Sequence, residues 1–235
     1  MIKLAVIKSG DKVYNGGKVM KDRFKRWKEM VRVWLADITP LLIEETYQKY
    51  YERLPLWRRE KADRMRMPKG KAQSVGVWSL WSRVKEMYGL PGDAVYNLSH
   101  SGKYVLCAFS DRPQAKVGCD LEEDGEFREA VARRFFCPKE YEHIMGEKEA
   151  DRAQLFCRYW VLKESFMKAT RKGMAMELDS FEIGWEDRTP VLVKKPEEYT
   201  EKYIYQEYDG EDIAVKIVVC TTDPDIDREL HILVL

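Results

Sequence analysis

The sequence predicts an α+β fold with two related halves, on three observations. Helical patterns occupy most of residues 40–88 and of the stretch from Glu122 to Gly173. From Phe181 onward, short apolar or alternating runs predict strands. A faint internal echo separates similar residues by 82 positions: Leu54 and Phe136, Trp78 and Trp160, Leu80 and Leu162. Amphipathic helices also match by chance at some offset, but if the echo reflects a duplication, it predicts two α/β lobes related by a pseudo-twofold axis.

The first 30 residues form a basic N-terminal extension, with nine Lys/Arg against three Asp/Glu. Within it, residues 2–8 alternate like a short strand, and residues 18–30 favour a basic helix. A second strand is predicted at 31–35, and Met30 directly before it is a candidate alternative start of translation.

The remaining elements divide into a predicted N-terminal lobe, 31–112, and a predicted C-terminal lobe, 113–235. The first lobe contains helices at 40–52, 56–66 and 68–88, then strands at 94–98 and 104–110 around a turn at 99–103. The second contains a strand at 116–122, a helix through Phe136, a helix begun by Pro138, a long helix from about Ala150, and strands at 181–185, 190–194, 202–208, 212–220 and 230–235.

Composition narrows the class of protein. The chain of 235 residues is 45% hydrophobic and 34% charged with a net charge of +1, which favours a globular core and argues against broad nucleic-acid binding. The sequence contains no membrane-spanning apolar run and no secretory leader, so we expect a cytoplasmic protein. The cysteines, at 107, 119, 137, 157 and 220, lack CxxC spacing and are expected to be reduced thiols.

Two carboxylates stand two residues apart in the predicted strand at 116–122. Asp120 and Glu122 should share one face, with apolar side chains on the other and Gly118 leaving room beside them. Paired oxygen ligands suit Mg²⁺, which completes its coordination with water and substrate phosphate. A solvent-exposed strand edge would show the same pattern.

The long helix carries a second group of charges, since Trp160, Glu164 and Lys168 follow helical spacing and Lys163 lies one step aside. Aromatic neighbours leave little wet surface around them, although a Glu to Lys pair four residues apart is usually an ordinary surface contact. The segment 97–103, which contains Ser99 and His100, offers hydroxyl, imidazole, ammonium and amide donors for phosphate, or is simply a turn.

Together, three segments resemble the larger, surfactin-type class of 4′-phosphopantetheinyl transferases. They are YNLSHSGKYVLCAF (96–109), VGCDLEE (117–123), and WVLKESFMK (160–168) followed by Lys172-Gly173. Their order and spacing match, and the likeness spans about residues 31–220. The resemblance implies a monomeric pseudo-dimer of two similar α/β lobes, with the active site in the cleft between them.

The resemblance also implies an activity: Mg²⁺-dependent transfer of the phosphopantetheine arm of coenzyme A to a serine of an apo acyl or peptidyl carrier protein. Adenosine 3′,5′-bisphosphate would be released. Position by position, it implies metal ligands at Asp120, Glu122 and Glu164, catalytic roles for Glu164, Lys163 and Lys168, and coenzyme A contacts at Ser99, His100, Lys163, Lys168, Arg58 and Lys61. Glu164 would accept the serine proton.

The chain departs from the family pattern where the family has nucleotide contacts. Gly70 and Gln73 stand where an Asp and an Arg are common, and Gly89-Leu90-Pro91-Gly92 replaces a Gly-Lys-Pro segment. Two alternatives therefore remain open: a coenzyme A or carrier-binding module without turnover, and another Mg²⁺-dependent pyrophosphate-cleaving enzyme.

Overall fold

The first half of the chain forms a sheet covered on one face by helices. The structure, a computed structural model, describes residues 4–7, 29–210 and 213–235. The elements of this half are β1 (Leu4–Ile7), β2 (Val31–Asp37), η1 (Thr39–Leu42), α2 (Glu44–Tyr51), α3 (Leu56–Asp63), α4 (Pro68–Tyr88), β3 (Val95–Ser101) and β4 (Tyr104–Ser110). The predicted basic helix at 18–30 lies almost entirely outside the described residues.

The second half repeats the pattern of helices followed by strands. Its elements are β5 (Val117–Glu123), α5 (Glu129–Phe135), α6 (Pro138–Gly146), α7 (Glu149–Ala169), η2 (Gly173–Ala175), η3 (Leu178–Ser180), β6 (Glu182–Glu186), β7 (Thr189–Lys194), β8 (Ile204–Gly210), β9 (Ile213–Thr221) and β10 (Ile226–Val234). The predicted α+β class and the predicted strands of the last third are confirmed. None of the helices in the described part of the chain is long and apolar enough to cross a membrane.

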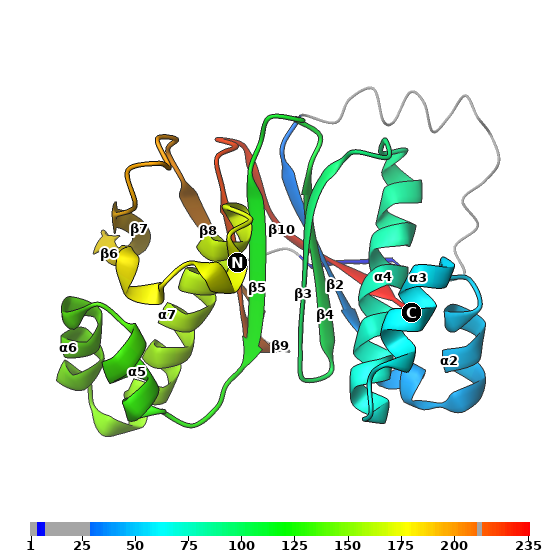
Figure 1. Cartoon of the computed structure of the whole chain (residues 1–235), viewed down its shortest axis with the longest axis horizontal. Helices are drawn as coiled ribbons and strands as arrows, with labels where there is room; N and C mark the ends of the chain where they lie inside the picture. Colours follow the sequence, from blue (N-terminus) through cyan, green and yellow to red (C-terminus); the bar gives the residue numbers. More distant parts are fainter. Residues whose placement is uncertain (1–3, 8–28, 211–212) are drawn as a thin grey trace.

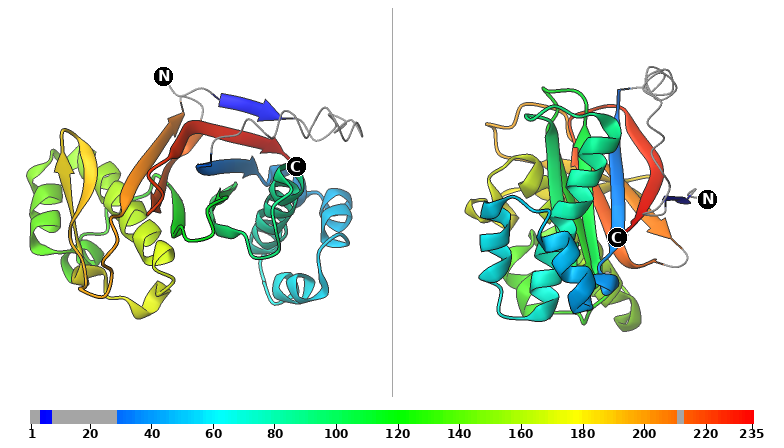
Figure 2. Two further views of the ribbon diagram at one scale, coloured as in Figure 1. Left: turned by 90° about the horizontal axis from the view of Figure 1, so that it is seen from above. Right: turned by 90° about the vertical axis from the view of Figure 1, so that its right-hand side faces the viewer.

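The strands are arranged in two main sheets with related order. The first is β1-β10-β2-β4-β3 and the second is β5-β9-β8, while β6 and β7 form a hairpin. In both, three antiparallel strands stand in the order first, third, second along the chain: β2-β4-β3 and β5-β9-β8. Strand β10 runs parallel to β1 and β2, so the end of the chain returns to the first sheet (Figure 2).

Three groups of buried side chains hold these layers together. One lies between α4 and the first sheet, and another between α7 and the second sheet. The third contains Val33 and Leu106 from the first sheet with Cys119 and Ile217 from the second, and it joins the two halves. Burial of apolar surface on this scale is the main stabilising contribution to such a fold. All five cysteines are free, as predicted, and the structure shows that they are also buried.

The hairpin between β3 and β4 differs from the sequence prediction. The strand predicted to end at Leu98 continues through Ser101, and the turn is confined to Gly102 and Lys103. Polar residues predicted a turn here because the local pattern does not reveal that Ser99 and Ser101 face another strand. The same alternation places the side chain of His100 on the opposite side.

Candidate functional site

Strands β3 and β5 lie side by side where the two sheets meet (Figure 1), and side chains join them. Alternate residues of β3 face β5 because side chains two apart on a strand point the same way. The hydrogen bonds that span this seam include Cys119 N to Asn97 Oδ1 (3.0 Å), Ser99 Oγ to Asp120 Oδ1 (2.7 Å), and Ser101 Oγ to Glu122 Oε2 (2.6 Å). Both strand carboxylates are therefore held by a β3 hydroxyl.

The turn at the end of β3 is fixed from two sides. Gly102 adopts a φ of 56°, in the left-handed region that favours glycine, and a Cβ there would overlap the Glu123 carboxylate. Glu123 Oε1 accepts from the backbone N–H of Lys103 (3.2 Å), and Gln73 Nε2 donates to the Gly102 carbonyl (3.0 Å). Gln73, a departure from the family pattern, thus links α4 to the seam.

A close backbone approach places α7 over the carboxylate face of β5. A Cβ on Gly118 would overlap the carbonyl oxygen of Ser165 and the backbone nitrogen of Ala169. Only glycine lets the helix lie this near the strand. The space that Gly118 is predicted to leave beside Asp120 and Glu122 is therefore filled by the backbone of α7.

Lys168, on α7, contacts both strands of the seam. Its Nζ donates to Asp120 Oδ1 (2.6 Å) and to Ser99 Oγ (2.9 Å). Burial opposes its charge, but the ion pair and hydrogen bond with Asp120 raise the pKa of Lys168 above its ordinary value. Asp120 is only 4% exposed, and its second oxygen, Oδ2, is buried with no hydrogen-bond partner among the residues that the structure describes. A buried, unpaired carboxylate oxygen calls for a cation or donor.

The other two acidic residues share the electrostatic field of Asp120. Burial, and then the negative charge of Asp120, raise the pKa of Glu164. Burial also raises the pKa of Glu122, with Asp120 adding to the shift and the hydrogen bond from Ser101 opposing it. Asp120 raises the pKa of both glutamates because the ionised carboxylates repel one another, so a bound cation would stabilise the charged group.

The three predicted metal ligands, Asp120, Glu122 and Glu164, do not form a compact cluster in the structure. Within the described part of the chain, the residues whose ligand atoms all lie within 4.8 Å of one another are Asp227, Glu229 and His231 on β10. There His231 Nε2 and Asp227 Oδ2 bond each other at 3.0 Å, and the imidazole stacks on Trp34. At the seam, the Lys168 ammonium group binds Asp120 directly.

Lys163 does not lie with these groups, which corrects its predicted catalytic and coenzyme A roles. Its side chain is fully buried, and Nζ contacts Glu140 Oε2 (2.9 Å) and the carbonyl oxygens of Leu178 (2.7 Å) and Phe181 (2.8 Å). Successive helical residues are about 100° apart, so Lys163 points well away from Glu164, whereas Lys168 is offset by only about 40°. Lys163 is therefore removed from the candidate site.

Arg58, Lys61 and His100 line one cavity of about 190 Å³ next to the seam. Arg58 is 6% exposed and donates from Nη2 to the Ser74 carbonyl (3.1 Å), while its buried Nε has no hydrogen-bond partner in the described part of the chain. Restricted solvation of the His100 ring, then the nearby Lys168 ammonium, lower the pKa of His100. The cavity thus combines cations with unused donors.

The sequence indicated the segment of Asn97 and Ser101 as a source of phosphate donors but not their contacts with β5, and it did not indicate Glu140 as the partner of Lys163. Strand alternation continued from Asn97 through Ser99 to Ser101 would have signalled the contacts with β5. Glu140 carried no such signal, since its partner lies on another helix 23 positions away.

The fold and the site define an α+β protein with acidic and basic side chains gathered where its two sheets meet. Comparison with known proteins gives the family. Residues 116–218, which carry the carboxylates and α7, match the family model of the 4′-phosphopantetheinyl transferase superfamily. The chain is 30% identical over 169 residues to 4′-phosphopantetheinyl transferase psf-1 of Bacillus pumilus, covering 64% of this chain and 70% of that protein.

Two further relatives match over shorter stretches. The chain is 33% identical over 138 residues to 4′-phosphopantetheinyl transferase Sfp of Bacillus subtilis (strain 168), covering 59% of each protein. It is 38% identical over 102 residues to 4′-phosphopantetheinyl transferase HetI of Nostoc sp., covering 43% of this chain and 42% of that protein. The chain belongs to the 4′-phosphopantetheinyl transferase superfamily, as its motifs predicted, and it spans less than two thirds of the length of Sfp.

Proposed function

We propose that this protein transfers the 4′-phosphopantetheine arm of coenzyme A to a serine of an apo acyl or peptidyl carrier protein, in a Mg²⁺-dependent reaction. The observation that carries the proposal is Asp120, whose buried Oδ2 lacks a hydrogen-bond partner beside Lys168 and Ser99. Family membership and the match over residues 116–218 support the substrate class.

Asp120, Glu122 and Glu164 are the residues that would hold Mg²⁺. The raised pKa values of Glu122 and Glu164 and the unpaired oxygen of Asp120 fit a site made for a cation. When bound, the metal would neutralise charge on the pyrophosphate of coenzyme A. Lys168 would then bind phosphate oxygens, since its ammonium can exchange Asp120 for a substrate anion.

In the proposed reaction, the serine oxygen attacks the β-phosphorus of coenzyme A, and the bond from that phosphorus to the bridging oxygen breaks. Adenosine 3′,5′-bisphosphate leaves with that oxygen. Glu164 accepts the serine proton, because burial and the negative charge of Asp120 make it a stronger base than an exposed glutamate. Ser99 and His100 would orient the pyrophosphate, while Arg58 and Lys61 would bind the 3′-phosphate.

We also propose that the two predicted lobes, 31–112 and 113–235, form a pseudo-dimer with coenzyme A bound between them, with β10 of the second lobe paired to β2 of the first. The shared strand order of β2-β4-β3 and β5-β9-β8 supports this. On this proposal the protein acts as a cytoplasmic monomer, with carrier protein and coenzyme A as partners and without nucleic acid or membrane.

The test is incubation of the protein with coenzyme A, Mg²⁺ and several apo carrier proteins, followed by intact-mass measurement of the carrier. We expect the carrier to gain one phosphopantetheine group and adenosine 3′,5′-bisphosphate to appear in equal amount. Nucleotide release without a carrier would instead indicate a pyrophosphate-cleaving enzyme. Tight binding of intact coenzyme A without turnover would indicate a binding module.

A further inference from the structure

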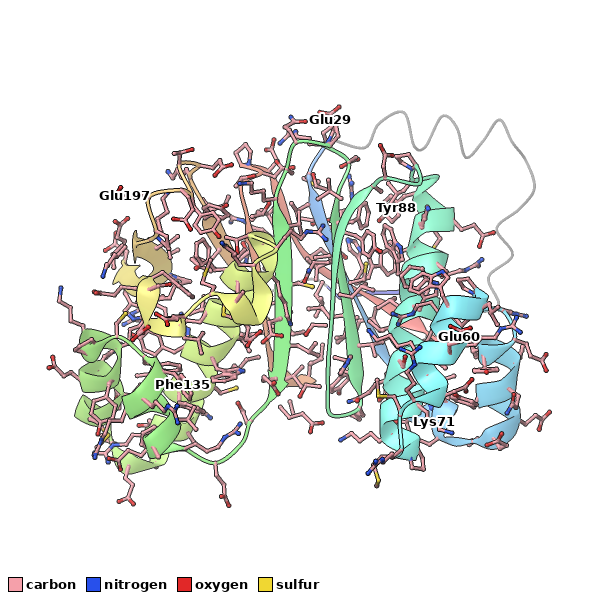
Figure 3. The ribbon with its side chains drawn as sticks, viewed as in Figure 1. Glu29, Glu60, Lys71, Tyr88, Phe135 and Glu197 are labelled. Atoms are coloured by element: carbon pink, nitrogen blue, oxygen red, sulfur yellow. The ribbon has the colours of Figure 1, made fainter. Side chains whose placement is uncertain are left out.

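An exposed tryptophan, Trp57, contacts Arg58, which lines the cavity together with Lys61 and His100. Trp57 is 54% exposed although it belongs to α3, the same short helix as Arg58 and Lys61. Trp57 and Lys61 are four positions apart and therefore lie on one side of that helix. Figure 1 shows α3 packed beside α4, and Figure 3 labels Glu60 on α3 and Lys71 at the start of α4.

The Trp57 ring is held in place by its neighbours. It meets Trp78 of α4 edge to face, with ring centroids 4.9 Å apart. The Arg58 guanidinium lies 5.4 Å from the Trp57 ring centroid and 4.8 Å from that of Trp78. Because these contacts already restrict the side chain, a ligand that stacks on its open surface would cost little conformational entropy.

The cavity is too small for a whole nucleotide. At about 190 Å³ it falls below the roughly 300–1,000 Å³ of ordinary ligand pockets. Its lining contains no Trp, Tyr or Phe side chain, so it offers cations and donors but no large aromatic surface for a base. A phosphate and part of a sugar fit this chemistry, whereas a purine would extend to the rim.

The position of the adenine base follows from the contacts of coenzyme A in the proposed function. In coenzyme A, one ribose carries the 5′-pyrophosphate, the 3′-phosphate and the base. If the pyrophosphate lies by Lys168 and His100 and the 3′-phosphate by Arg58 and Lys61, the ribose spans the cavity. The base, attached to the carbon beside the ring oxygen, then emerges at the rim close to those two cations.

We propose that Trp57 stacks on the adenine of coenzyme A and is a specificity-determining residue for the nucleotide end. Stacking needs only the flat face of the base, so it supplies binding where Gly70 and Gln73 lack the charged groups common in the family. Trp78 is the less suitable surface, because it is already packed against Trp57, Arg58 and Tyr96.

The experiment is calorimetric titration of the full chain with two probes, adenosine 3′,5′-bisphosphate and inorganic pyrophosphate, both with Mg²⁺. Trp57→Leu should weaken nucleotide binding by about 5-fold or more, the loss typical of one base stack, and leave pyrophosphate binding unchanged. Trp57→Phe should restore most of the affinity. Leu56→Ala is the matched control, because Leu56 is 70% exposed on the same helical turn and should not matter.

Three results would overturn the inference. Unchanged nucleotide affinity in Trp57→Leu would show that the base lies elsewhere. Equal loss for both probes would mean that the substitution disturbs the pyrophosphate site as well, so that the loss cannot be assigned to stacking on the base. An increased carrier KM with unaltered nucleotide affinity would make Trp57 a carrier contact. If the unaltered protein binds neither the nucleotide nor coenzyme A, the proposed function itself fails. If it binds them and only the Trp57 results differ from expectation, the inference on Trp57 fails alone.

Discussion

Helix α7 carries two lysines that each form an ion pair with an acidic residue. The two ion pairs differ in how completely their polar atoms are hydrogen-bonded. In the first, Lys163 has three acceptors, and Glu140 accepts from Lys163 and from the backbone N–H groups of Cys137 (2.8 Å) and Ile183 (2.7 Å). In the second, Lys168 pairs with Asp120, but Asp120 Oδ2 has no hydrogen-bond partner.

The difference separates a structural ion pair from a binding site. The pair of Glu140 and Lys163 is fully buried and satisfied, and it ties α6 and the segment before β6 to α7. The pair of Asp120 and Lys168 retains an unused oxygen beside two more carboxylates, and part of the Lys168 side chain remains exposed. Such a group can exchange its internal contacts for those of a ligand.

The largest expected effect is on turnover, from Glu164→Gln. This change keeps the side-chain size but removes the proposed base and one metal ligand, so carrier modification should fall by about 10²–10⁴-fold. Stability should change little, because Glu164 is not part of the satisfied pair. Steady-state kinetics and urea unfolding together measure this. An active Gln variant would contradict the role of Glu164.

The second effect is on stability, from Lys163→Met. Loss of the ammonium group leaves Glu140 buried without its partner, so the free energy of unfolding should fall by about 3–5 kcal/mol. Urea denaturation measures this, and the double variant Lys163→Met with Glu140→Gln should recover part of the loss. If Lys163→Met instead keeps its stability and loses turnover, Lys163 is catalytic and the comparison between the two lysines fails.

The smallest effect concerns His100. Its pKa is lowered from 6.5, so the imidazole is neutral at pH 7 and gains a proton only below the ordinary value. His100→Ala should raise the KM for coenzyme A about 2- to 10-fold at pH 7 through loss of a hydrogen bond, with a smaller effect on kcat.

As the pH falls below 6.5, the KM of the unaltered protein should improve relative to that of His100→Ala, because an imidazolium binds phosphate more strongly than a neutral imidazole. Parallel KM profiles for the two proteins between pH 5.5 and 7.5 would show that His100 does not titrate against the phosphate. A larger fall in kcat than rise in KM would make its role chemical.

Much of the candidate site followed from local periodicity. Alternation along β5 placed Asp120 and Glu122 together, with Gly118 beside them, and helical spacing placed Lys168 near Glu164. Lys163 could not be placed in the same way. A helix surrounded by aromatic residues does not reveal which charged side chain meets an internal partner, because that partner, Glu140, comes from another helix.

The sequence by itself determined the α+β class, the order of the helices and strands, and the family, because periodicity and motif spacing are properties of contiguous residues. The tertiary structure alone decided which lysine faces the carboxylates, that the β3 hydroxyls bind Asp120 and Glu122, and that β10 joins β2. These contacts join residues distant in the chain, and they depend on how whole elements pack around a shared core.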